Sequence, residues 1–107
     1  MCPVCGNVIL STGKALVSCC GILLPPLEAE AAEGEHTIHV EQIEDEYYVT
    51  VDHSMTREHY LSFLAAVSDN GVQLVKLYPE GNAEARFKIN GVRRIYAYCN
   101  RHGFFER

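Results

Sequence analysis

The sequence predicts a mainly β protein built from a small metal-bound hairpin module and a following antiparallel β-sandwich. Two observations predict it. Close cysteine pairs, Cys2 with Cys5 and Cys19 with Cys20, lie in an N-terminal segment too short to bury a core, which is typical of a module folded around a metal. From His36 onward, short runs of β-branched and aromatic residues are separated by turn signals, which is the pattern of successive hairpins.

The N-terminal module is expected to span residues 1–26. Two short apolar runs, 8–10 and 15–17, suggest the two strands of a hairpin whose turn is formed by residues 11–14. Two consecutive prolines then break regular structure and end the module.

Residues 27–35 are acidic and alanine-rich but lack an apolar face, so we expect a solvated linker. The sandwich is expected to fill residues 36–107. Its first two strands are expected at 37–43 and 46–51, joined by an acidic turn. Residues 59–67 suit either a helix or a buried strand. Three further strands, each following a turn signal, are expected at 72–78, 83–89 and 92–98.

The chain has 107 residues, 48% apolar and 21% charged, which fits one globular unit of domain size. Its net charge of −5 argues against nucleic acid as a direct partner. No apolar run approaches the roughly 18 residues of a membrane helix. No signal peptide is recognisable, so we expect a cytoplasmic protein without a membrane partner. Because Cys2 directly follows Met1, the chain is also consistent with a domain cut from a longer protein.

Four of the five cysteines predict a tetrahedral metal site: Cys2, Cys5, Cys19 and Cys20. Two thiolates on one tight knuckle, joined by an adjacent pair after a short connection, suit zinc or iron. Adjacent cysteines rarely form a disulfide with each other, because the peptide between them strains the bond geometry. The spacing alone does not choose between zinc and iron.

The fifth cysteine lies among histidines. His53 and His59 are six residues apart, and Cys99 and His102 are three apart at the end of an expected strand, with Gly103 allowing a sharp turn. One thiolate among several imidazoles indicates redox iron more than a structural ion. Taken one at a time, such histidines are more often ordinary surface or core residues.

These motifs resemble the desulfoferrodoxins, which are two-domain superoxide reductases. The resemblance rests on Cys2-x2-Cys5 with Cys19-Cys20, on HSMTREHY at 53–60 and on YCNRHG at 98–103, and covers nearly the whole chain. It implies a desulforedoxin-like module with one iron in four cysteines, and an immunoglobulin-like sandwich with a second iron held by four equatorial histidines and one axial cysteine. By motif, the second-iron ligands are His36, His53, His59, Cys99 and His102. His39 competes with His36 for the first of these positions.

The resemblance also implies an activity: one-electron reduction of superoxide to hydrogen peroxide, with re-reduction by an external electron donor such as rubredoxin. Superoxide or another small oxidant is therefore the expected partner. Zinc remains possible at the four-cysteine site. Family members often form dimers, and exposed sheet edges would allow a homodimer here.

The chain departs from the family pattern next to one expected ligand. Gly34-Glu35-His36 stands where the family has Glu-Lys-His, so the lysine that attracts superoxide and helps to protonate the product is missing. Glu33 and Glu35 are candidates for a carboxylate ligand at the open iron position that the resemblance implies. Two other departures, Ser54 for a proline and Phe105 for a tryptophan, are interpreted as packing changes.

Two alternatives stay open. The first is a redox- or metal-sensing domain of a larger helix-turn-helix transcriptional regulator with weak or no turnover, which the missing lysine favours. The second is a structural β-sandwich with zinc in its cysteine module and an empty second site.

Overall fold

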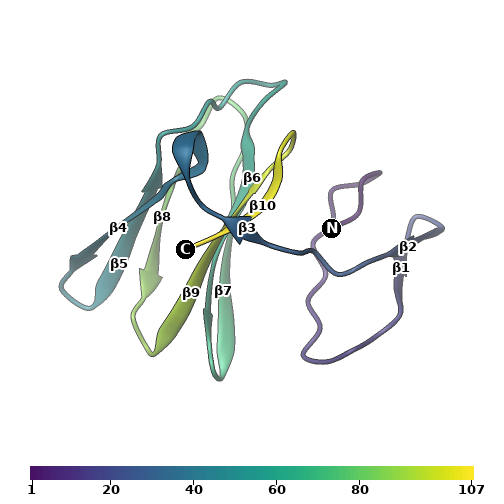
Figure 1. Ribbon diagram of the computed structural model, residues 1–107, viewed down its shortest axis with the longest axis horizontal. Helices are drawn as coiled ribbons and strands as arrows, with labels where there is room; N and C mark the ends of the chain where they lie inside the picture. Colours follow the sequence, from purple (N-terminus) through teal and green to yellow (C-terminus); the bar gives the residue numbers. More distant parts are fainter.

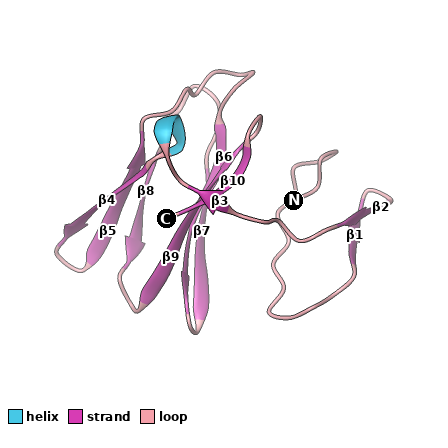
Figure 2. Ribbon diagram, in the orientation of Figure 1, coloured by secondary structure: helices cyan, strands magenta, loops and turns pink.

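The computed structural model describes all residues 1–107 and contains ten strands with one short 3-10 helix, η1 (Figures 1 and 2). The elements are β1 (Val17–Cys19), β2 (Ile22–Leu24), β3 (Glu30–Ala31), η1 (Gly34–His36), β4 (Ile38–Ile43), β5 (Glu46–Val51), β6 (Leu61–Ser68), β7 (Gly71–Lys76), β8 (Glu84–Lys88), β9 (Val92–Cys99) and β10 (Gly103–Glu106). The predicted mainly β fold is confirmed. None of the helical structure is long or apolar enough to cross a lipid bilayer.

Two sheets face each other to form the sandwich, and a separate two-stranded hairpin, β1-β2, lies to one side (Figure 1). The larger sheet has the order β3-β10-β9-β6-β7 and the smaller has the order β4-β5-β8. All pairings are antiparallel except the short one between β3 and β10. Phe87, Leu61, Leu64 and Val49 are almost fully buried in the core between the sheets. Burial of such a side chain stabilises the fold by roughly 1.5–3 kcal/mol.

The ambiguous segment at residues 59–67 is a strand, β6, near the middle of the larger sheet. Its apolar run is continuous because both faces are covered. Leu61 and Leu64 belong to the sandwich core, whereas Phe63 and Ala65 are buried outside that core, on a cavity shared with the N-terminal module. A strand covered on both faces loses the alternation that usually identifies it.

The N-terminal hairpin was predicted in the wrong place. Residues 8–10 form no strand, and the hairpin instead pairs β1 with β2 around Cys20 and Gly21. Both turn residues have positive φ, 54° and 74°, as a tight two-residue hairpin turn requires. The turn therefore lies beside the metal-ligand candidates, and residues 11–14 form only a bend in a loop.

Part of the expected linker has regular structure. Strand β3 pairs in parallel with β10 through Glu30 and Phe105, and η1 follows it directly. This pairing attaches the connection to the sandwich edge and brings His36 to the same end of the molecule as the β9–β10 turn (Figure 2). Strand β10 was not anticipated, because it is short and follows the turn immediately.

Candidate metal centres

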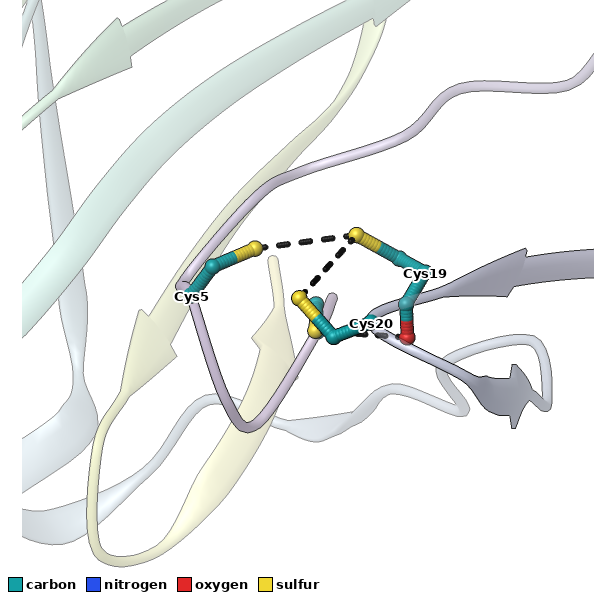
Figure 3. A group of neighbouring side chains, drawn as sticks. Cys5, Cys19 and Cys20 are labelled. Carbon is teal, nitrogen blue, oxygen red and sulfur yellow. Dashed lines mark hydrogen bonds between the residues drawn. The ribbon is translucent and has the colours of Figure 1, made fainter.

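The four N-terminal cysteines converge. The sulfurs of Cys2, Cys5, Cys19 and Cys20 all lie within 4.8 Å of one another. The Cys19 sulfur lies 3.6 Å from that of Cys5 and 3.9 Å from that of Cys20, and the dashed lines of Figure 3 join it to both. The loop carrying the first pair is closed by two backbone hydrogen bonds of 2.9 Å, from Gly6 to Cys2 and from Cys2 to Asn7.

The thiols of this cluster hinder one another's ionisation, and a bound cation would relieve this effect. Hydrogen bonding from the Cys5 backbone lowers the pKa of Cys2 to about 7. Hydrogen bonds that Cys20 makes with Cys5, then with Cys2 and Cys19, raise the pKa of Cys20 to about 12, and the pKa of Cys19 is raised for the same first two causes. Four sulfurs this close do not all ionise alone, whereas a bound cation would favour every thiolate. The residues fit zinc or iron equally well.

The second cluster forms at one end of the sandwich. His36 comes from η1, His53 and His59 from the β5–β6 loop, Cys99 from the last position of β9, and His102 from the β9–β10 turn. The ligand atoms of His36, His59, Cys99 and His102 lie within 4.8 Å of one another. The fifth residue, His53, is their direct neighbour, with its ring centroid 5.1 Å from that of His36 and 4.6 Å from that of His59.

The four imidazoles form a closed ring of neighbours, which we call a circuit of four imidazoles. His102 completes it, with its centroid 5.0 Å from those of both His36 and His59. Each ring thus neighbours two others around a common centre. The Cys99 sulfur, which is fully buried, lies 3.5 Å from His102 Nδ1. Four nitrogens around a centre with one sulfur beside them form a suitable cage for a transition metal.

Unpaired nitrogens show which atoms face that centre. The Nε2 atoms of His36, His53 and His59 are buried and have no hydrogen-bond partner. Buried polar atoms are normally paired, so three unpaired nitrogens in one cluster fit a site that binds a cation. His53 Nδ1 lies 2.7 Å from the Ser54 carbonyl, and a proton on Nδ1 donated to that oxygen leaves the Nε2 lone pair free for a metal.

Burial also favours the neutral form of His36 and of His59. Desolvation is the main cause that lowers the pKa of His36 and of His59, and the positive charge that a neighbouring His53 would carry is the next cause for both. A neutral imidazole is the form that binds a metal. Phe105 stacks on the His36 ring, with centroids 4.1 Å apart and an angle of 8° between the ring planes, and so holds that ring in place.

Hydrogen bonds shape the β5–β6 loop and join it to the β9–β10 turn. His59 N donates to Thr56 Oγ1 over 3.1 Å, which folds His59 back toward His53. Tyr60 N donates to Asn100 Oδ1 over 2.9 Å, and Asn100 N donates to the Tyr60 carbonyl over 3.1 Å. Sequence reasoning missed this role of Asn100, although an asparagine inside a turn between two candidate ligands was a usable signal.

The two residues left open near His36 lie in different places. His39 is outside the cluster, with its side chain 55% exposed and Nε2 3.8 Å from Asp52. Glu35 reaches the cluster, with Oε1 3.8 Å from His102 Nδ1. The structure therefore brings together the five candidate ligands in the set with His36 and leaves His39 outside it. The Glu35 carboxylate lies at the edge of this cluster.

Comparison with known proteins assigns the family. The Desulfoferrodoxin family profile matches residues 25–107. The chain belongs to the desulfoferrodoxin family. A desulfoferrodoxin homologue of Archaeoglobus fulgidus is 31% identical over 98% of this chain and 91% of that protein. A desulfoferrodoxin of Clostridium acetobutylicum is 30% identical over 72% of this chain and 64% of that protein.

A solved structure gives the same family assignment. The superoxide reductase from Treponema pallidum superposes with a TM-score of 0.75 and 29% identity, covering 87% of this chain and 79% of that one. The desulfoferrodoxin resemblance predicted from the motifs is confirmed. The family assignment and the two ligand clusters make this a metal-binding β protein of an oxidoreductase family.

Proposed function

We propose that this protein reduces superoxide to hydrogen peroxide at an iron bound by His36, His53, His59, His102 and Cys99. The circuit of four imidazoles closed by one buried thiol is the observation that carries the proposal. The likeness to a superoxide reductase supports it independently.

The reaction needs little from the protein beyond a shaped cation site. Bound ferrous iron would supply one electron to superoxide, and two protons complete hydrogen peroxide, after which an external donor returns the electron. The neutral imidazoles leave the positive charge of the ion uncancelled, which favours approach of a small anion. A Cys99 thiolate would donate electron density to a bound iron, as a thiolate does in cysteine-ligated haem. Its full burial excludes water from the sulfur.

The four-thiolate cluster is proposed as a second, structural or electron-relaying site. Iron is the expected ion, with zinc as the alternative. We further propose the division into a module at 1–26, a linker at 27–35 and a sandwich at 36–107. A rubredoxin-like electron donor, a cytoplasmic location and a homodimer complete the proposal. The chain supports the homodimer by exposing large apolar side chains on the module, including Leu16 at 91% and Leu23 at 61% exposure.

Glu35 favours a second candidate function. A carboxylate 3.8 Å from His102 Nδ1 places a negative charge beside the proposed iron site, where it would repel superoxide, which is also negative. Slow turnover would suit a redox- or metal-sensing domain, which needs to change state without processing many substrate molecules.

One experiment separates these functions. Protein purified anaerobically from iron-rich medium is analysed for iron and zinc, oxidised, and examined for a ferric thiolate absorption band. The ferrous form is then mixed with superoxide, beside a Cys99→Ala variant. The proposal predicts iron at the histidine centre, a thiolate band lost in Cys99→Ala, and second-order oxidation that exceeds the variant's rate. A wild-type rate no faster than that of Cys99→Ala would refute the enzyme, and a single zinc per chain would identify the structural alternative.

A further inference from the structure

Arg101 occupies an unusual place beside the histidine–cysteine centre. It lies in the β9–β10 turn directly before His102, and its Nε donates to the Glu58 carbonyl over 3.1 Å. Asn100 Nδ2 donates to the same carbonyl over 3.0 Å. Because Glu58 directly precedes His59, the Arg101 side chain is tethered between two ligand-bearing loops. The tether costs the guanidinium much of its freedom, so its charge stays near the centre.

The charge of Arg101 is not cancelled by an ion pair. Four of the five other arginines each lie within 4.0 Å of a carboxylate: Arg57 with Glu80, Arg86 with Glu46, Arg93 with Asp69 and Arg94 with Glu106. The fifth, Arg107, donates to the Ile38 carbonyl, away from the candidate ligands. Arg101 has no such partner in the structure, and its residue is exposed to solvent. The chain as a whole carries a net charge of −5. An arginine without an ion-pair partner beside the candidate metal centre is therefore a local positive charge in a mainly negative protein.

We propose that Arg101 is a fixed positive charge that raises the affinity of the histidine–cysteine centre for small anions. The inference deepens the proposed function, on which it rests, by naming a residue that attracts the anionic substrate. Glu35, on the edge of the same centre, acts against it. The balance of these two opposite charges then sets anion affinity, and salt weakens both contributions because the Debye length is about 10 Å at 0.1 M ionic strength.

The test measures azide binding to the ferric centre, at low and high ionic strength, in wild type, Arg101→Gln, Arg101→Lys and Arg93→Gln. Azide is a small anion that does not depend on turnover. Arg93 is the matched control, since it also carries one charge but lies at the far end of β9 from Cys99 and pairs with Asp69. Iron content and the ferric thiolate band are recorded for each variant.

We expect Arg101→Gln to weaken azide binding about threefold at low salt and less at high salt, as loss of a nearby exposed charge should. Arg101→Lys should recover most of the affinity, and Arg93→Gln should match wild type. Unchanged azide affinity in a fully iron-loaded Arg101→Gln protein, or a Lys variant as weak as the Gln variant, would overturn the charge role. Loss of iron from Arg101→Gln would also overturn it, in favour of a purely structural tether. A wild-type chain without iron at this centre would instead overturn the proposed function itself.

Discussion

At the scale of single residues, the histidine centre is defined by where nitrogen atoms point. His53 and His39 are the same type of residue in opposite environments. His53 has a buried, unpaired Nε2 and a partner for Nδ1, whereas His39 is half exposed and lies near Asp52. Only the first arrangement leaves a lone pair inside the molecule for a metal.

His53→Gln should therefore weaken iron binding by at least about tenfold, because the proposed site would lose one of four imidazole nitrogens that would bind the ion together. His39→Gln, the matched control, should bind iron as wild type does. Competition with a chelator at fixed pH measures both affinities. Equal affinities for the two variants would mean that His53 is not a ligand.

Glu35 gives a second residue-scale prediction. Glu35→Lys replaces a negative by a positive charge 3.8 Å from the centre's edge, so superoxide should oxidise the ferrous protein about tenfold faster at low salt. Glu35→Ala removes the negative charge alone and should give an intermediate rate. Stopped-flow mixing at several ionic strengths measures the difference. A Glu35→Lys rate at or below the wild-type rate, with iron content unchanged, would show that Glu35 is not a barrier to the anion.

At the scale of elements, the chain could be predicted well where propensity and burial agree. Strand β5 falls at Glu46–Val51 as expected, because its β-branched and aromatic residues pair with β4 across a turn in which Glu44 has a φ of 56°. Strand β6 was ambiguous because burial on both faces removed its alternation. The β1–β2 hairpin was misplaced because its turn lies at Cys20, a candidate metal ligand and not an ordinary turn residue.

For the candidate site, the sequence predicts the ligand types but not their arrangement in space. The ligand types and their approximate pairs follow from short spacings, but the circuit of four rings joins η1, a loop and a turn that are distant in sequence. No local pattern reveals such a juxtaposition. The stacking of Phe105 on His36 depends on β10, a strand too short to be recognised from the sequence.

The hairpin module should depend on its metal more than the sandwich does. β1 and β2 have three residues each, and of their side chains only Leu24 is buried. Cys19→Ser removes the sulfur that contacts those of both Cys5 and Cys20, so the module should lose its ion and its order while the sandwich stays folded. Hydrogen exchange, followed by mass spectrometry, should show fast exchange in residues 1–24 alone. Ser18→Ala, on the exposed face of β1, is the control that should leave exchange unchanged, and simultaneous loss of protection in β6 would contradict the division into two modules.

At the scale of the whole molecule, the module stands beside the larger sheet and covers only part of its outer face (Figure 1). An apolar cavity of about 400 Å³ lies between them, with Leu10 and Leu24 on the module side and Phe63 and Phe104 on the sheet side. Most of the exposed large apolar side chains also belong to the module: Val4, Ile9, Leu10, Leu16, Ile22 and Leu23. Exposed apolar surface concentrated on one part of a protein favours a protein–protein interface.

The proposed homodimer should therefore form through the module. Wild type is expected to sediment as a dimer at micromolar concentration, and the double variant Leu16→Glu/Leu23→Glu as a monomer, because two charges would have to be buried in the interface. Tyr78→Glu is the matched control, since Tyr78 is 67% exposed but lies in the β7–β8 loop of the sandwich, and it should leave the dimer intact. Sedimentation velocity with metal-loaded protein measures all three, and metal analysis confirms that the module is folded in each. A monomeric wild type, or a double variant that stays dimeric, would show that the apolar face of the module does not bind a second copy.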